Sequence, residues 1–154
     1  MFSETALKEL EDIRAKYPTA RAALLPALYV AQREFGWLSG EAYEAVSDVL
    51  GVPGAIARGV GTFYAMYKHA PMGKNVVQLC TNVACMIMGA ERLVDLLKVK
   101  YGLEPGGTTP DGRFSLVIME CIGACGTAPA MLVNNDFYEN LTEQNIGEIL
   151  EKYK

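Results

Sequence analysis

Two stretches organise this sequence, LCTNVACMIMGAERL at Leu79–Leu93 and MECIGACGTAPAML at Met119–Leu132. Together they hold all the cysteines of the chain, which are Cys80, Cys85, Cys121 and Cys125. Four residues separate the first pair, three separate the second, and thirty-five lie between the pairs. Each pair adjoins a short apolar segment of the strand type and is surrounded by small residues. This arrangement indicates a site in which four thiolates hold an inorganic centre.

Two kinds of centre compete for such a site. A [2Fe–2S] cluster takes four thiolates, two on each iron, and two local pairs joined by a long connection match that division. Cys80 and Cys85 would then bind one iron, and Cys121 and Cys125 the other. A structural zinc ion also takes four cysteines, although its pairs commonly have two residues between the ligands. The spacing favours the cluster and leaves zinc open.

Disulfides and nucleophilic catalysis are weaker explanations of the cysteines. Met1–Tyr17 is charged and helix-periodic, unlike a signal peptide, and the longest apolar stretch, around Leu24–Ala31, is too short to span a bilayer. We therefore expect a reducing cytoplasmic environment, in which disulfides are rare. The only histidine, His69, lies in a polar linker, which is a poor place for a catalytic base.

Composition excludes two further classes of protein. The net charge is −4, and Lys and Arg are scattered without a basic stripe, so nucleic acid is not an expected partner. Apolar residues make up 51% and charged residues 21%, which excludes wholesale disorder and favours a surface partly covered by a partner.

The first half of the chain has the apolar periodicity of four short helices. Ser3 and Ser39 are suited to cap the first and third helices, and Pro53 to open the fourth. The second helix, roughly residues 21–35, contains Pro26, which predicts either a late start or a kink. The residues expected to face the interior of this bundle are Leu7, Leu10, Ile13, Tyr17, Leu24, Leu28, Ala31, Phe35, Tyr43, Val46, Leu50, Ile56, Val60, Phe63 and Tyr67.

The second half alternates between strand and helix patterns in the order β-α-β-β-β-α. Strands are predicted over residues 76–80 and 114–121, with one helix over residues 86–101 between them. Cys85 would then lie just before that helix, whose N-terminal N–H groups favour negative charge. Small residues around Cys121 and Cys125 would let backbone N–H groups approach the sulfurs.

The end of the chain predicts a hairpin followed by a helix. The segments 130–133 and 137–139 flank Asn134-Asn135-Asp136, and Thr142 can cap a last helix through Tyr153. The predicted fold class is α+β, with a helical bundle over residues 1–70 and a mixed-sheet domain over residues 74–154.

Several longer segments of the sequence resemble one known family specifically. CTNVAC, GAERL, ECIGACGTAP and NNDFYENLT, with ALLPALYVAQREFGWLS and GVGTFYAMY earlier in the chain, closely resemble the thioredoxin-like [2Fe–2S] ferredoxin subunit of respiratory NADH:quinone oxidoreductase (complex I). This is the small E-type subunit, similar to NADH dehydrogenase flavoprotein 2, that accompanies the flavin-bearing subunit. The resemblance covers about Ala22 to Tyr153 and strongly favours the cluster over zinc.

The resemblance implies a thioredoxin-like C-terminal domain with one [2Fe–2S] cluster on Cys80, Cys85, Cys121 and Cys125. It implies electron transfer inside an NADH-oxidising module, in which FMN and NADH bind the partner subunit and this chain exchanges single electrons with the flavin. The chain would be part of an enzyme, in the cytoplasmic, peripheral part of a membrane-associated complex, yet would not oxidise NADH alone. Alternatives are the small subunit of an NAD-linked hydrogenase or formate dehydrogenase, or a free-standing ferredoxin shuttle.

The helical half has no cysteine and invites a separate hypothesis. Phe63, Tyr64, Met66 and Tyr67 crowd its last helix, and not all of them can face inward at 3.6 residues per turn. Aromatic and Met surface is enriched at protein interfaces, so we expect this half to dock the flavin-bearing subunit.

Overall fold

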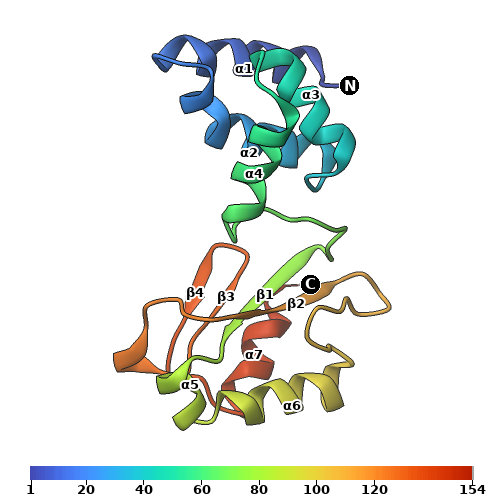
Figure 1. The fold of residues 1–154 in the computed structure, drawn as a ribbon. Helices are drawn as coiled ribbons and strands as arrows, with labels where there is room; N and C mark the ends of the chain where they lie inside the picture. The colour runs from blue at the N-terminus through green and yellow to red at the C-terminus, as the bar shows by residue number, and fades with distance from the viewer. Residues whose placement is uncertain (154) are drawn as a thin grey trace. The chain divides into compact units, whose positions relative to one another are not determined.

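The structure is a computed structural model that describes residues 1–153. The chain divides into two compact units, Met1–Pro71 and the segment that begins at Met72. Figure 1 draws the helices and strands of both units, and each unit has a hydrophobic core of its own.

The first unit is a bundle of helices. Its elements are α1 (Glu4–Lys16), the short 3-10 helix η1 (Arg21–Ala23), α2 (Leu24–Phe35), α3 (Gly40–Leu50) and α4 (Gly54–Phe63). Large side chains from three of these helices are fully buried in its core, among them Leu10, Leu28 and Val46. The four helices predicted for this half of the chain are confirmed.

Caps and a proline explain where these helices begin. Ser3 Oγ accepts from the Ala6 N–H at 3.2 Å, and Ser39 Oγ accepts from the Ala42 N–H at 3.1 Å. Each bond satisfies an amide that has no partner within its own helix. Pro26 is the third residue of α2, in the first turn, where its missing N–H costs no helical hydrogen bond. The helix therefore starts late, at Leu24.

The inward face of α1 differs from the prediction. Leu7 and Tyr17, both expected inside, are exposed, whereas Ala6 and Leu10 are buried one turn apart. Tyr17 lies beyond the last helical residue. The periodicity was compatible with two neighbouring stripes, and packing selects the one that contains the small Ala6.

The inward face of α4 also differs. Phe63, expected inside, is 80% exposed, and the buried positions are Ala57 and Gly61. A Cβ on Gly61 would come within 2.6 Å of the Tyr43 ring, so a residue without a side chain is what allows this close approach. Tyr67 is buried as expected, but it lies after the helix and donates to the Leu25 carbonyl at 2.8 Å.

The second unit is a mixed sheet with helices. Its elements are β1 (Asn75–Cys80), α5 (Val83–Ile87), α6 (Ala90–Tyr101), β2 (Phe114–Met119), the 3-10 helix η2 (Cys125–Thr127), β3 (Met131–Val133), β4 (Asp136–Tyr138) and α7 (Asn145–Glu151). The strand order is β2-β1-β3-β4, with β1 parallel to β2 and the other pairs antiparallel. The predicted α+β class and mixed sheet are confirmed.

Alternate residues of the central strand build the core of this unit. Val77 and Leu79 of β1 are fully buried together with Leu97 of α6 and Ile146 and Leu150 of α7. Because alternate residues of a strand point to one face, α6 and α7 pack on the same face of the sheet (Figure 1). This core holds the strand ends, and hence the cysteines beside them, in place.

The helix predicted over residues 86–101 is two helices. α5 ends at Ile87 and α6 begins at Ala90, with Gly89 between them at φ +96°. An L-residue rarely adopts this φ, so a glycine is suited to the break. Cys85 consequently lies inside α5 and not before a helix, which corrects the expected placement of its sulfur.

The predicted hairpin is confirmed. β3 and β4 form it, with Val133 paired to Asp136 and Asn134 at φ 56°. The last helix is shorter than predicted, because α7 runs from Asn145 to Glu151 and Gln144 precedes it, although Thr142 Oγ1 accepts from the Asn145 N–H at 3.1 Å. Among the described residues, no helix has both the length and the apolar character needed to cross a bilayer.

Candidate iron–sulfur site

The cysteines lie at the ends of two neighbouring strands. Cys80 is the last residue of β1, and Cys121 follows the last residue of β2 by two positions. The strands are parallel, with Cys80 opposite Met119, so both deliver their cysteines to the same edge of the sheet. Cys85 lies on α5 and Cys125 opens η2. The structure thus brings the two sequence pairs, 41 residues apart at Cys80 and Cys121, to one end of the unit.

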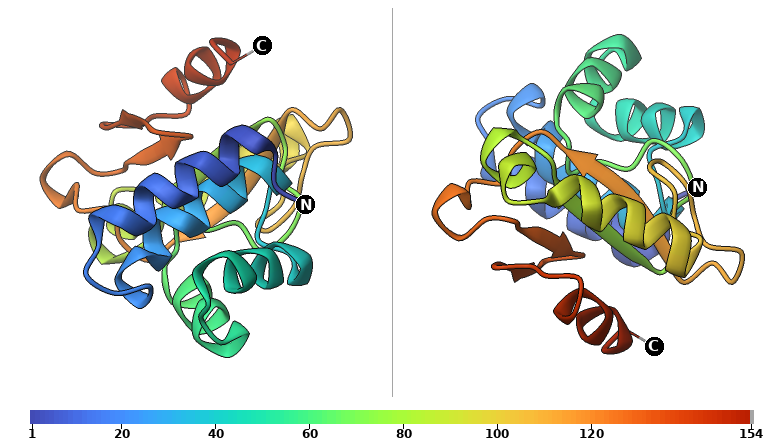
Figure 2. Two further views of the ribbon diagram at one scale, coloured as in Figure 1. Left: turned by 90° about the horizontal axis from the view of Figure 1, so that it is seen from above. Right: turned by 90° about the horizontal axis from the view of Figure 1, so that it is seen from below.

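The two pairs differ in exposure. Cys80 is 3% and Cys85 2% exposed, whereas Cys121 and Cys125 are exposed. Small residues pack around the buried pair, chiefly Ala84, Ala90 and Ala128. The loop around η2 lies beside α5 in all the views of Figures 1 and 2. One side of the site is therefore closed by the protein and the other is open.

Burial and neighbouring groups act on the Cys85 thiol. Burial, a hydrogen bond with Cys80 and the nearby sulfur of Cys125 all raise the pKa of Cys85, and the backbone N–H of Ala130 lowers it in part. A raised pKa means that the thiolate of Cys85 is not stabilised by the protein alone. A metal cation would supply the missing positive charge.

Backbone groups contact the other sulfurs. The Gly123 N–H donates to Cys121 Sγ at 3.4 Å, and the Cys80 thiol donates to the Glu120 carbonyl at 3.8 Å. Together with the Ala130 N–H beside Cys85, this places an N–H donor at one sulfur of each pair. Four thiols, small neighbours and N–H donors aimed at sulfur fit a [2Fe–2S] cluster.

Within residues 1–153, no three His, Cys, Asp or Glu side chains are placed to hold one metal ion in this structure.

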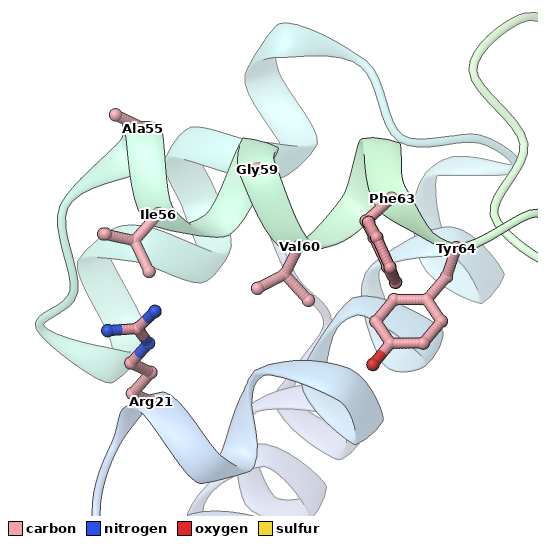
Figure 3. A pocket seen from close by; sticks show the side chains of 7 residues that line it. All are labelled: Arg21, Ala55, Ile56, Gly59, Val60, Phe63 and Tyr64. Atoms are coloured by element: carbon pink, nitrogen blue, oxygen red, sulfur yellow. The ribbon is translucent and has the colours of Figure 1, made fainter.

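A second feature lies in the helical unit. A cavity of about 340 Å³ opens between η1 and α4 (Figure 3) and is lined by Arg21, Ala55, Ile56, Gly59, Val60, Phe63 and Tyr64. The sequence pointed to Phe63 and Tyr64 but not to Arg21, because no local pattern places η1 opposite α4. The Phe63 and Tyr64 rings meet edge to face, with centroids 5.0 Å apart.

Comparison with known proteins agrees with these observations. Residues 10–154 match the sequence model of the family described as thioredoxin-like [2Fe-2S] ferredoxin. The chain is 41% identical to an E-type subunit of NADH-quinone oxidoreductase from Rhizobium meliloti (strain 1021), over 97% of this chain and 89% of that protein. It is 39% identical to the E-type subunit of the NADH-quinone oxidoreductase of Escherichia coli (strain K12), over 90% of this chain and 83% of the relative.

A solved structure is similar as well. It is an NAD+-reducing [NiFe]-hydrogenase in the air-oxidized state, with a TM-score of 0.72 and 25% identity over 84% of this chain. The chain spans only 22% of the hydrogenase chain that it matches. The family match and the full-length relatives confirm the resemblance seen in the sequence, and the chain belongs to the thioredoxin-like [2Fe–2S] ferredoxin family.

Proposed function

We propose that this chain is the electron-transfer subunit of an NADH:quinone oxidoreductase and that Cys80, Cys85, Cys121 and Cys125 hold its [2Fe–2S] cluster. The observation that carries the proposal is the delivery of both cysteine pairs to one edge of the sheet by the parallel strands β1 and β2. The relatives from NADH-quinone oxidoreductases support the same function. The chain would act in the cytoplasmic, peripheral part of a membrane-associated complex.

Each residue of the site has a part in this function. Cys80 and Cys85 would hold one iron, and Cys121 and Cys125 the other. When bound, the cluster supplies one-electron redox chemistry. Ala84, Ala90 and Ala128 exclude water from the buried pair. The exposed pair leaves the other side accessible, and this is the side from which a redox partner can come close.

A division of labour with a partner subunit follows. The sequence has no G-x-G-x-x-G after a strand and thus no dinucleotide fingerprint. Hydride chemistry would belong to FMN and NADH on a flavin-bearing partner subunit, with which this chain exchanges single electrons. This chain would act inside the enzyme without binding its substrate.

The helical unit would dock that partner. Phe63, at the cavity between η1 and α4, is 80% exposed, and Met66 is exposed three positions later. An apolar side chain of the partner could fill a cavity of about 340 Å³ that Ile56 and Val60 line (Figure 3). Arg21 on the opposite wall would favour a polar or acidic group next to it.

A second candidate is the equivalent subunit of an NAD-linked hydrogenase. The likeness to the NAD+-reducing [NiFe]-hydrogenase chain favours it, since the match covers most of this chain. Purification of the native complex separates the two candidates, because the partners would be either hydrogenase subunits or subunits of a quinone-reducing complex.

The cluster is tested by analysis of the purified full chain. We expect a red-brown protein with about two irons and two acid-labile sulfides per chain. A colourless protein with one zinc per chain and no sulfide would refute the proposal.

A further inference from the structure

We propose that Gly123 is a positioning residue that raises the reduction potential of the cluster, because its backbone N–H donates to Cys121 Sγ while its positive φ lets the chain turn towards Cys125. The inference rests on the proposed function, since it concerns the residues around the cluster. It concerns the reduction potential of the cluster and not its presence. The proposed function and the proposed role of Gly123 can therefore be refuted by different results.

The first step is the contact. The Gly123 N–H lies 3.4 Å from Cys121 Sγ. A thiolate bound to iron carries more negative charge when the cluster is reduced, so an N–H donor stabilises the reduced state more than the oxidised state. The donor therefore makes the potential less negative.

The second step is the backbone conformation. Gly123 has φ +85°, and this torsion sets the course of the chain from the Gly123 N–H towards Cys125. An L-residue prefers a negative φ. Since Cys121 and Cys125 would both be bound to one iron, a change of φ at Gly123 must be absorbed by the peptide plane before it, and this turns the Gly123 N–H away from Cys121 Sγ.

The third step is the open space around Gly123. An added Cβ on Gly123 meets no atom within 4 Å, so a substitution acts through φ and not through a clash. The other donor, the Ala130 N–H beside Cys85, precedes β3 and is held by the sheet, since the Ala130 carbonyl accepts from the Cys80 N–H at 3.1 Å. Gly123 lies outside the strands, in the segment between β2 and η2, and Cys121 belongs to the exposed pair of cysteines.

The chain offers a matched control and an intermediate variant. Gly126 lies in η2 directly after Cys125, has no positive φ, and also has open space around an added Cβ. Gly126→Ala therefore adds the same methyl group without turning a donor. Asn tolerates positive φ better than Ala, and this chain already uses Asn134 and Asn140 at φ 56° and 49°. Gly123→Asn should retain more of the donor than Gly123→Ala.

The test is a redox titration of the full chain, followed by the electron paramagnetic resonance signal of the reduced cluster, in samples with equal iron and sulfide content. We expect Gly123→Ala to have a more negative potential than the wild type, Gly123→Asn to lie between them, and Gly126→Ala to match the wild type. The iron–sulfur stretching frequencies of Gly123→Ala should shift as well, which a purely structural role would not produce.

Several outcomes would overturn the inference. One is a Gly123→Ala potential equal to those of the wild type and Gly126→Ala at full cluster content. Another is an equal shift in Gly126→Ala, which would assign the effect to the loop in general. If neither Gly123 variant holds a cluster, Gly123 is needed for assembly and is no tuning residue. Absence of a cluster from the wild type would instead refute the proposed function.

Discussion

At the scale of the residue, exposure separates cysteines that the sequence presents as equivalent. Cys80 and Cys85 are buried against alanine side chains, whereas Cys121 and Cys125 are exposed. Burial raises the pKa of the Cys85 thiol. The buried pair is thus expected to anchor the cluster, and the exposed pair to present it to a partner.

Each cysteine should be required for the cluster. Replacement of Cys80, Cys85, Cys121 or Cys125 by Ala removes one of two protein ligands on an iron, and we expect the visible absorption and the sulfide content to be lost or severely reduced. Thr81→Ala, beside Cys80 but without a sulfur, is the control and should keep both. A variant that retains the normal spectrum would remove its cysteine from the ligand set.

Acid stability has a contribution from Asp111. Its Oδ1 accepts from Thr109 Oγ1 at 2.5 Å and from the Arg113 N–H at 2.9 Å, and these bonds lower the pKa of the Asp111 carboxyl. A carboxyl whose pKa is lower in the folded state stabilises the protein above its unfolded pKa, about 3.9, and this contribution is lost as the pH falls through the folded value. Asp111→Asn should therefore lower the melting temperature at pH 7 more than at pH 3.

Asp95→Asn provides the comparison for that experiment. Asp95 is exposed on α6 in the same unit and makes no side-chain hydrogen bond within residues 1–153. Its substitution should leave the pH dependence of the melting temperature nearly unchanged. Equal effects of the two substitutions at both pH values would show that the bonds to Asp111 add no stability.

At the scale of the element, a close contact between helices positions α4, and strand pairing positions the cysteines. α4 approaches α3 through Gly61, which lies against the Tyr43 ring. β1 and β2 pair in parallel and bring both cysteine pairs to one edge. These contacts use backbone and small residues, which is why apolar periodicity misassigned Phe63 and passed over Gly61.

Gly61→Ala should destabilise the helical unit. Its Cβ would come within 2.6 Å of the Tyr43 ring, so the ring or α4 must move, at a cost of about 1–3 kcal/mol typical of an overpacked core. Gly59→Ala is the matched control, since its Cβ meets nothing within 4 Å in the same helix. Gly59→Ala should be stabilising by up to about 1 kcal/mol, because Ala has the higher helix propensity. Urea unfolding followed by circular dichroism measures both, and equal effects would contradict the contact.

At the scale of the whole molecule, the chain has an identified family and a function that needs a partner. The fold class, the family and an electron-transfer subunit of the NADH:quinone oxidoreductase type, all predicted from the sequence, are confirmed by the structure and by the relatives from such oxidoreductases. The cluster ligands and the flavin-bearing partner stay proposals, and two experiments address the partner.

The isolated chain should not reduce dyes with NADH, even when its cluster is complete, because it carries no dinucleotide fingerprint. Addition of the flavin-bearing subunit should restore NADH-dependent dye reduction and reduce this chain's cluster. Robust NADH oxidation by the pure chain would contradict the division of labour.

Docking through the helical unit is tested on the full chain. Phe63→Ala removes an exposed ring at the cavity, and we expect weaker binding to the flavin-bearing subunit, by about 1 kcal/mol or more if Phe63 is an anchor. Val99→Ala is the control, because Val99 is similarly exposed but lies on α6 of the other unit. Calorimetric titration with unchanged affinity for Phe63→Ala would assign docking to other surfaces.

The sequence by itself determined the element order, the helix caps at Ser3 and Ser39, the hairpin at Asn134, and the family. These depend on neighbouring residues, since a cap or a tight turn is a short-range contact and a family is recognised from local words. It also singled out every cysteine of the candidate site, because thiols are rare and their spacing is visible.

Only the tertiary structure decided which cysteine pair is buried, where the long helix breaks, and which faces of α1 and α4 point inward. Burial of Cys80 and Cys85 depends on the pairing of β1 with β2 and on the packing of Ala128 against α5, which join residues far apart in the chain. The cavity beside Arg21 arises likewise from two helical segments that no local pattern relates. Interactions between neighbouring residues determine where helices and strands form, whereas packing between distant segments determines which of their side chains come into contact.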